Sequence, residues 1–533
     1  MTEGNGDIRE LPKGWCWIEL EEISDFKNGI NFKKEQKGGQ GILTVDVLNM
    51  YSQGVNVALD KLYRVDIKID RERILKYGDI LFVRSSVKRE GVGWAALFKE
   101  SSEPITFCGF IIRARISSVE IHPEYLTYYL RTHSAREKIV ASSNQVTITN
   151  INQDSLGKIR IPLCSAKEQE RIVEKIEELF SDVDKGVESL KTAQKQLKVY
   201  RQAVLKWAFE GKLTKAWRKQ HSSTLKTGEA LLAQIKTERE TRYQQRLVEW
   251  ETAVKEWEAI GKVGRKPTKP QNSKDFSLLT QSENSNLPKL SDGWCWERAG
   301  NIFSEINNGH TPTKEKLNPS NGEVPFLKVY NLTHNGSLDF KDLTFIARET
   351  HKLELTRSIV YPDDVLFNIV GPPLGKVSLV PPEYSEYNIN QAVVVFRPNK
   401  RYLAKFLMYA LLTRSVITWI LSTGKATAGQ TNLKVSSCRE QPLPVCSTEE
   451  QERIVEEIES RLSICDQLEA TIIENLQKAE ALRQSILKQA FEGKLVPQDP
   501  NDEPAEKLLE QIRLERQEKQ PPQTSKQLKI KGI

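Results

Sequence analysis

Two long stretches of the chain carry apolar residues at a seven-residue spacing. Val183, Leu190, Leu197 and Val204 follow this spacing in the first stretch, and Cys465, Ile472, Ala479 and Ile486 follow it in the second. Further apolar residues flank the two stripes: Ile172, Ile176, Phe180 and Val187 in the first stretch, and Ile454, Ile458, Leu462, Leu468, Leu476 and Leu482 in the second. An apolar heptad repeat sustained over this length predicts a coiled coil.

Both stretches have helix start and stop signals. Each begins with the Ser-x-x-Glu spacing of a capping box, at residues 165–168 and 447–450. Each ends in Phe-Glu-Gly-Lys-Leu, where Gly211 and Gly493 can adopt the left-handed conformation that closes a helix. The first helix, counted over residues 168–210, has 43 residues. At ~1.5 Å per residue it forms a rod of about 65 Å.

Outside these helices the pattern changes to short apolar runs. Segments 79–83, 110–116, 364–370 and 392–398 are short, rich in β-branched residues and bounded by Gly, Pro or Asn, which predicts strands. Segments 123–140 and 401–421 instead predict amphipathic helices. The mixture indicates an α/β domain in each half of the chain.

The same motifs occur twice in the same order. Gly-Trp-Cys-Trp stands at 14–17 and 293–296, Glu-Gln-Glu-Arg-Ile-Val at 168–173 and 450–455, and Ala-Phe-Glu-Gly-Lys-Leu at 208–213 and 490–495. The segments between matching motifs diverge. We therefore predict an internal repeat with pseudo-two-fold symmetry, in which two duplicated α/β domains are separated by long helices that pair as an antiparallel coiled coil.

The motifs also give boundaries for the parts of the chain. We expect an α/β domain at 11–164, a helical region at 165–263, a polar linker with Pro and Ser at 264–289, a second α/β domain at 290–446, and a helical region with a tail at 447–533. The stretch 241–260 has no counterpart in the second half. We interpret its Trp250 and Trp257, seven residues apart, as ordinary helix packing, with a partner-facing stripe as the alternative.

Composition narrows the class of protein. A net charge of +7 over 533 residues permits contact with a polyanion without demanding it. The longest apolar stretch, 406–412, is far shorter than the roughly 20 residues that span a bilayer, and we expect neither a membrane segment nor a signal peptide. The 7 cysteines form no Cys-x-x-Cys pair, which argues against a disulfide framework and a zinc site. These features favour a cytoplasmic protein.

The catalytic motifs that we sought are incomplete. The segments at Gly371 and Ser422 lack the glycine spacing of a phosphate-binding loop, and Tyr361-Pro-Asp-Asp lacks the acidic-x-Lys strand of a nuclease. Asp79 and its repeat Asp364 stand directly before strands, so we interpret them as turn or cap residues rather than catalytic acids. We therefore expect no catalytic residue and no metal site on this chain.

The doubled order of motifs resembles the specificity subunits of type I restriction–modification systems. The resemblance rests on the Gly-Trp openings, the Glu-Gln helix starts, the Ala-Phe-Glu-Gly-Lys-Leu ends and the Arg/Glu-rich tails, and it covers residues 11 to about 517. The region after Gly211, Trp-Arg-Lys-Gln onward, resembles the central conserved region of the enterobacterial branch. One departure is that Pro-Leu-Cys and Pro-Val-Cys stand where the family usually has Pro-Leu-Pro before the helix.

The resemblance implies a function and a set of partners. The α/β domains would be target recognition domains, each reading one half of a split, asymmetric DNA sequence, and the helices would be spacers that dock other subunits. The implied partners are double-stranded DNA, two methyltransferase subunits and two restriction/translocase subunits. S-adenosylmethionine, ATP and Mg²⁺ would bind to those partners, and this chain would bind no cofactor of its own.

Polar and basic loop residues are the candidates for DNA contact, because they supply phosphate charges and base-edge hydrogen bonds. The alternative for any single one is a solvated loop position. In the first domain we select Lys27, Asn28, Lys33, Lys34, Arg84, Ser85, Ser86, Lys88, Arg89, Ser143, Asn144, Gln145 and Thr147. In the second domain we select Asn308, Thr311, Thr313, Lys314, Asn368, Lys376, Lys425, Thr427, Gln430 and Thr431.

Two other classes of function stay open at this point. A stand-alone nuclease or methyltransferase with a duplicated reading domain would need catalytic motifs beyond those found. A coiled-coil scaffold that never contacts DNA would show no sequence preference in binding experiments.

Overall fold

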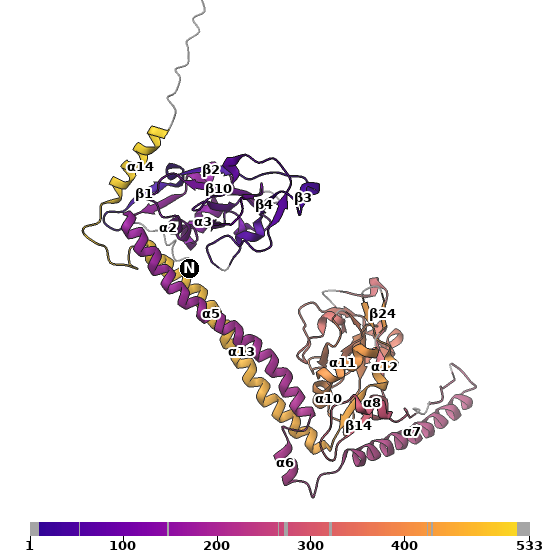
Figure 1. The fold of residues 1–533 in the computed structure, drawn as a ribbon. Helices are drawn as coiled ribbons and strands as arrows, with labels where there is room; N and C mark the ends of the chain where they lie inside the picture. Colours follow the sequence, from indigo (N-terminus) through magenta and orange to yellow (C-terminus); the bar gives the residue numbers. More distant parts are fainter. Residues whose placement is uncertain are drawn as a thin grey trace, which may run out of the picture. The chain divides into compact units, whose positions relative to one another are not determined.

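The computed structural model describes residues 10–52, 54–145, 149–264, 266–270, 275–318, 322–371, 373–423, 425–427 and 430–519. Contacts divide the chain into two compact units (Figure 1). The first unit comprises residues 1–191 and 473–533, and the second comprises residues 192–472. Each unit therefore combines segments that lie far apart in the sequence.

The α/β domain of the first unit is built on an antiparallel sheet. Its strand order is β2 (Ser24–Asn28), β10 (Ile111–Ile116), β6 (Ile80–Val83) and β8 (Ala95–Leu97). Alternate residues of β6 point to opposite faces. Ile80 and Phe82 pack with helices α2 (Pro123–Leu130) and α3 (His133–Ala141), whereas Leu81 and Val83 pack against a second sheet. That sheet has the order β3 (Lys37–Gly38), β5 (Tyr63–Val65), β4 (Ile42–Val45) and β9 (Ile105–Phe107).

The second unit repeats this architecture. Its main sheet has the order β15 (Ile306–Asn308), β23 (Val393–Phe396), β19 (Val365–Asn368) and β21 (Val377–Leu379). Helices α10 (Ala404–Leu411) and α11 (Arg414–Thr423) pack on one face. A sheet of β17 (Thr344–Ile346), β16 (Val324–Leu327), β22 (Tyr387–Ile389) and β18 (Ile359–Val360) lies beside the other face. The predicted duplication of an α/β domain is confirmed.

The predicted single helices at 123–140 and 401–421 are each broken in two. Thr132 stands at the first break, where its Oγ1 accepts a hydrogen bond from Ala135 N at 3.2 Å and caps α3. Thr413 stands at the second break, and its Oγ1 donates to Ala410 O at 2.7 Å. Threonine favours such side chain–backbone bonds over a continuous helix, which the apolar periodicity alone did not reveal.

In each α/β domain the first strand pairs with the last strand. β1 (Cys16–Glu19) pairs with β13 (Arg160–Leu163), and β14 (Cys295–Arg298) pairs with β26 (Pro442–Val445). The chain passes directly from β13 into α5 (Ala166–Phe209) and from β26 into α13 (Thr448–Phe491). The Gly-Trp openings are therefore held beside the helix starts.

Helices α5 and α13 have 44 residues each, and they run antiparallel within each unit. In the first unit, Ile172 and Ile176 near the start of α5 share a core with Ile486 and Phe491 near the end of α13. In the second unit the end of α5 meets the start of α13 in the same way: Val204, Leu205, Ala208 and Phe209 pack with Ile454, Val455 and Ile458.

The apolar stripe is not buried evenly. Ile172, Ile176, Ile454 and Ile458 are fully buried, whereas Val183, Leu190 and Leu197 are only half-buried. Leu468 and Leu482, which the sequence placed beside the stripe, are 48% and 50% exposed. Between the two domain cores, the stripe residues Cys465 and Ile472 of α13 are buried, whereas those of α5 are half-buried.

The helix ends agree with the sequence. Gly211 and Gly493 both have a φ of +67°, the left-handed region that favours glycine. Beyond these ends, the chain forms α6 (Lys215–Gln220) and α7 (Gly228–Ala259) in the second unit, and α14 (Ala505–Lys519) in the first. Among the helices of the described residues, none combines the length and apolar character needed to span a bilayer.

Helices α14 and α7 occupy matching places on the two domains. Ala505 N donates to Gly14 O at 2.9 Å, and Gly228 N donates to Gly293 O at 2.7 Å. Helix α7 continues through the stretch 241–260, where Trp250 and Trp257 donate their Nε1 protons to Pro267 O and Gly264 O at 3.0 and 3.2 Å. Both tryptophans thus pack on the returning chain of their own unit.

Candidate nucleic-acid interface

The repeated Glu-Gln motif fixes each long helix to its α/β domain. Glu168 is 5% exposed and accepts a hydrogen bond from Trp15 Nε1 at 3.1 Å. Glu450 is 3% exposed and accepts from Trp294 Nε1 at 2.8 Å. A serine caps the start of each helix, as predicted. Ser165 Oγ accepts from Glu168 N at 3.1 Å, and Ser447 Oγ accepts from Glu450 N at 3.2 Å. The Glu carboxylates bond to the tryptophans rather than completing a reciprocal capping box.

The glutamine that follows makes a second connection. Gln169 Oε1 accepts from His122 N at 2.9 Å, and its Nε2 donates to Cys164 O at 3.1 Å. Gln451 repeats both bonds with Leu403 N at 2.9 Å and Cys446 O at 3.1 Å. Both glutamines are fully buried. The motif therefore holds each domain in a fixed orientation on the start of its own helix.

A small sheet continues from one end of each main sheet. In the first domain it consists of β7 (Ser85–Ser86), β12 (Thr149–Asn150) and β11 (Asn144–Gln145). In the second domain it consists of β20 (Val370–Gly371), β25 (Gln430–Asn432) and β24 (Lys425–Thr427). Segments that lie far apart in the sequence of each domain are thus brought into one sheet.

Two further loops join this sheet in each domain. Arg84 N donates to Phe110 O at 2.7 Å, and its counterpart Ile369 N donates to Ala392 O at 2.9 Å. Gly29 N donates to Ile111 O at 3.0 Å, as Gly309 N does to Val393 O. We call these combined loops the loop edge. It comprises residues 28–34, 84–91, 109–110, 144–145 and 149–150 in the first domain, and 308–314, 369–371, 391–392, 425–427 and 430–432 in the second.

Most predicted contact residues of the first domain lie on its loop edge. Lys33 and Lys34 are exposed at the 3₁₀ turn η1 (Lys34–Gln36), and Lys88 and Arg89 are exposed beside η4 (Arg89–Gly91). Asn28 ends β2, Arg84, Ser85 and Ser86 lie in or beside β7, Ser143 precedes β11, and Asn144 and Gln145 form it. Lys27 directly precedes Asn28 in β2 and pairs with Asp70 and Glu72. Thr147 falls outside the described residues.

The second domain divides into surface and bracing residues. Asn308, Thr311, Thr313 and Lys314 lie on the loop edge, as do the backbones of Lys425, Thr427, Gln430 and Thr431. Asn368 is instead fully buried: its Nδ2 donates to Val370 O and Pro373 O at 3.0 and 2.9 Å, and its Oδ1 accepts from Lys376 N at 2.7 Å. Lys376 Nζ donates to Val329 O at 3.1 Å. These two residues therefore hold the neighbouring loop in place.

The sequence did not point to the turns Gly109–Phe110 and Gln391–Ala392. Phe110 is 60% exposed beside Arg84, whose guanidinium donates to Gly109 O at 3.4 Å. Gln391 is exposed, and its carbonyl oxygen accepts from Asn308 Nδ2 at 3.4 Å. The signal available in the sequence was the gap between two apolar runs in each half, which predicts a tight turn between two strands. In the structure each of these turns lies beside the loop that begins at Gly29 or Gly309.

The basic loop after Arg84 is held at its far end by two partly buried arginines. The Arg131 guanidinium lies 3.9 Å from the centre of the Trp94 ring, and Arg136 Nη2 donates to Glu90 O and Val92 O at 2.7 and 2.8 Å. Burial lowers the pKa of Arg131 to about 9 and that of Arg136 to about 10, so both remain protonated at neutral pH. Lys88 and Arg89 are thereby presented from a braced loop.

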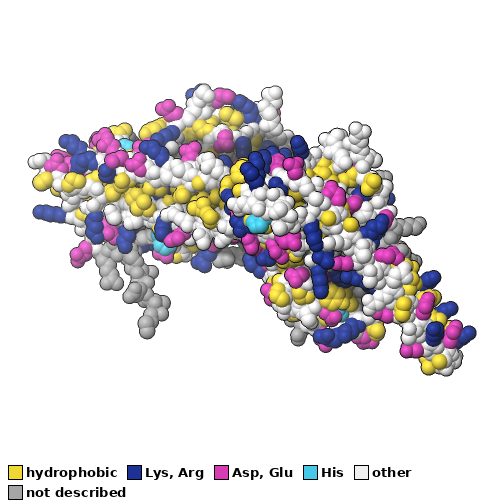
Figure 2. All heavy atoms as spheres, turned by 90° about the horizontal axis from the view of Figure 1, so that it is seen from below, with side chains coloured by type: hydrophobic (Ala, Val, Ile, Leu, Met, Phe, Trp, Pro, Cys, Tyr) yellow, Lys and Arg dark blue, Asp and Glu magenta, His cyan; other side chains and the backbone are white. Residues whose placement is uncertain are grey.

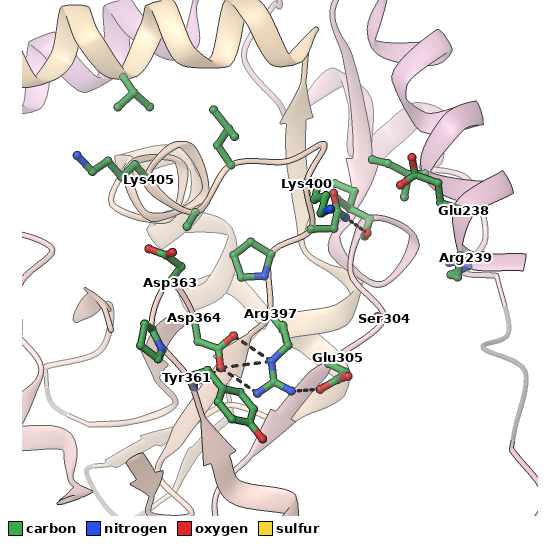
Figure 3. A pocket seen from close by; sticks show the side chains of 18 of the residues that line it. Glu238, Arg239, Ser304, Glu305, Tyr361, Asp363, Asp364, Arg397, Lys400 and Lys405 are labelled. Atoms are coloured by element: carbon green, nitrogen blue, oxygen red, sulfur yellow. Dashed lines mark hydrogen bonds and ion pairs between the residues drawn. The ribbon is translucent and has the colours of Figure 1, made fainter. Parts of the chain in front are cut away.

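The repeated acid before each central strand is structural, in agreement with the sequence. Asp364 is 2% exposed, accepts from Tyr361 N at 2.9 Å and pairs with Arg397, which also bonds to Glu305 (Figure 3). These residues line an open pocket of about 850 Å³ within the second unit. Burial raises the pKa of Asp364, although the Arg397 guanidinium opposes the shift. Asp79 makes the corresponding bonds to Lys76 N and Arg115 at 2.8 and 2.6 Å.

Positive and negative side chains are mixed on the face of the molecule that Figure 2 shows. Lys and Arg side chains are interspersed there with Asp and Glu. With a net charge of +7, any binding to a polyanion must rely on local clusters such as Lys33–Lys34 and Lys88–Arg89.

Comparison with known proteins identifies the class to which this arrangement belongs. The family model described as "Type I restriction modification DNA specificity domain" matches residues 12–198 and 296–478. The chain belongs to this family, and its two matches coincide with the two copies of the repeat. Membership supports the role of a non-catalytic specificity subunit and supports neither of the two alternative classes of function.

Similar proteins share nearly the whole length of the chain. The EcoKI specificity subunit of Escherichia coli K12 is 24% identical over 528 residues, which is 95% of this chain and 96% of that protein. The StySPI specificity subunit of Salmonella potsdam is 24% identical over 536 residues, with the same coverage. A chain from a structural study of type I restriction–modification complex assembly has the same fold, with a TM-score of 0.62 at 17% identity over 91% of this chain and 99% of that one.

Proposed function

We propose that this protein directs a type I restriction–modification complex to a two-part, asymmetric DNA sequence in the cytoplasm. Each α/β domain reads one half of the sequence through its loop edge. Two methyltransferase subunits and two restriction/translocase subunits assemble with the chain, and S-adenosylmethionine, ATP and Mg²⁺ bind to those partners.

One observation carries this proposal: the same loop edge is built twice on the same framework, with different side chains. Arg84 in the first domain corresponds to Ile369 in the second, and the basic Lys88–Arg89 loop corresponds to a segment rich in proline and glycine. Two equal readers would serve a symmetric site. Two different readers on matched supports suit an asymmetric target in two parts.

The test is sequence-specific binding and methylation by the chain assembled with methyltransferase subunits. Binding should fall steeply with salt, because phosphate contacts release counterions. Sequencing of the modified positions should show one two-part motif. Modification without a sequence preference, or a single uninterrupted motif, would contradict the proposed function.

Replacing Lys33 with alanine should weaken DNA binding evenly across sequences. An exposed lysine on the loop edge supplies a phosphate contact, so its loss should reduce the slope of log affinity against log salt by about 1 and leave the methylated sequence unchanged. Filter binding at several salt concentrations measures both. Lys255→Ala removes an exposed lysine from α7 and is the matched control. An equal slope for Lys33→Ala and the control would remove Lys33 from the interface.

Shortening both long helices by one heptad should shorten the spacer of the target. Deleting residues 188–194 from α5 and 473–479 from α13 retains the Asp184–Arg483 pair and the Arg201–Glu469 pair, and it preserves the phase of the stripe. Seven residues correspond to about 10 Å of helix, or about three base pairs, if helix length sets the spacing. Sequencing of methylated DNA gives the spacer.

Removing five residues from each helix is the control, because it rotates the stripe out of phase and should abolish assembly. A functional one-heptad variant with the original spacer would refute the hypothesis that helix length sets the spacing.

A further inference from the structure

The loop edges of the two domains can be aligned by their backbone hydrogen bonds. Gly29 N and Gly309 N donate to Ile111 O and Val393 O, and Arg84 N and Ile369 N donate to Phe110 O and Ala392 O. Counting from these bonds, Gly109 corresponds to Gln391. Counting from the two glycines, Asn31 corresponds to Thr311. Both correspondences rest on the backbone hydrogen bonds, because the residue types at these positions differ.

The glycines force this loop close to the turn. A Cβ on Gly29 would lie 2.0 Å from Cys108 O, and one on Gly309 would lie 2.0 Å from Ile389 O. Only glycine allows so close an approach of the two backbones. The residues two positions later, Asn31 and Thr311, are thereby placed against the turn.

In the second domain the half-buried Asn308 amide donates to the backbone of the turn. One exposed carboxamide also lies at this contact in each domain, but it comes from opposite sides. In the first domain Asn31 Oδ1 occupies the space where a Gly109 side chain would begin, 2.0 Å from the position of its Cβ. In the second domain the turn itself supplies Gln391, and Thr311 Oγ1 donates to Gln391 Oε1. Where the loop has the amide the turn has glycine, and where the turn has the amide the loop has the smaller threonine.

Both amides are exposed on the loop edge. A side chain needed only to brace the turn would be buried, as Asn368 is. A carboxamide has a donor and an acceptor in one plane, and this pair matches the N7 and N6 groups that adenine presents in the major groove. Contact with Thr311 leaves Gln391 Oε1 its second lone pair and restricts the side chain before binding.

We propose that Asn31 and Gln391 are the adenine-specifying side chains of the first and second domains. The proposal rests on the proposed DNA-reading function and adds to it which residue in each domain reads which base. A sequence alignment of the two halves does not match Asn31 with Gln391, because the carboxamide lies on the loop in the first domain and on the turn in the second.

The experiment uses the chain assembled with methyltransferase subunits and sequences the methylated sites. Gln391→Ala should relax one A·T position in one half of the target by on the order of 10- to 100-fold, and Asn31→Ala should do so in the other half. Gln391→Glu should shift the preference at the same position toward cytosine, whose N4 donates to a carboxylate. Gln245→Ala, an exposed glutamine on α7, is the matched control and should leave the motif unchanged.

An exchange variant tests the swapped arrangement directly. Asn31→Thr with Gly109→Gln gives the first domain the arrangement of the second and should restore adenine preference that Asn31→Thr alone loses. A motif that is unchanged in both alanine variants, relaxation at a G·C position, or loss of all methylation in both would overturn the assignment. Failure of the wild-type complex to modify a two-part motif would instead overturn the proposed function.

Discussion

Replacing residues 20–159 with the matching segment of a relative that has a different target should change one half of the methylated sequence and leave the other half intact. The physical reason is that the loop edge of the first domain is built entirely from residues 28–150. The junctions lie at the end of the β1–β13 pair, immediately before the bond from Leu20 N to Ile159 O at 3.0 Å. The graft therefore retains Trp15, its bond to Glu168 and the whole of α5.

The donor segment must preserve its apolar contacts with the long helices, such as that of Tyr128 with Phe180. Phe491 from the end of α13 packs against Tyr125 and Tyr129 of α2, with ring centres 5.1 and 5.2 Å apart. A donor with large aromatic residues at both places keeps this core, whereas small residues there would leave a cavity that costs several kcal/mol. Such a loss of stability would hide the change in specificity.

Exchange of residues 299–441 is the matched control for this experiment. It should alter the opposite half of the target, and the double exchange should alter both halves. Sequencing of methylated DNA provides the measurement in each case. A change in both halves after a single exchange would contradict the assignment of one domain to one half.

Local and repeated features of this fold were predictable from the sequence. Some signals depend only on residues close to one another in the sequence, so one sequence is enough to find them. They are the heptad stripe, the capping serines and the glycines Gly211 and Gly493 at the helix ends. The Trp15–Glu168 bond joins residues 153 positions apart. The only sequence evidence for this contact was that the Gly-Trp motif and the Glu-Gln motif both occur once in each half.

The candidate interface was less predictable because exposure and partners decide the role of a polar side chain. Asn368 and Asn308 look alike in the sequence, yet the first is fully buried in three hydrogen bonds and the second is half-buried at the loop edge. Gln391 lies in the gap between two apolar runs, which marks a turn but does not reveal the role of its side chain. The helix breaks at Thr132 and Thr413 were missed for a similar reason, since a capping threonine also fits an amphipathic pattern.

Replacing Glu450 with alanine should destabilise the second unit by about 3–5 kcal/mol, the cost of breaking a buried ion pair. Its carboxylate accepts from Trp294 Nε1 at 2.8 Å, Thr214 Oγ1 at 2.7 Å and Arg218 Nε at 2.7 Å. The Arg218 side chain is 17% exposed, so the variant leaves a poorly hydrated cation without its counter-ion. Denaturant unfolding followed by tryptophan fluorescence should detect the loss.

The first domain provides the comparison that separates charge from hydrogen bonding. Glu168 accepts from Trp15, and its neighbour Arg171 pairs with Asp502 at 2.5 Å. Glu168→Ala should therefore cost only about 1–3 kcal/mol, the penalty for a donor left without an acceptor. Glu449→Ala, one residue before the buried acid and exposed, should cost less than about 1 kcal/mol. If Glu450→Ala were no more destabilising than Glu168→Ala, the Arg218 ion pair would contribute nothing to the attachment of the second domain to its helix.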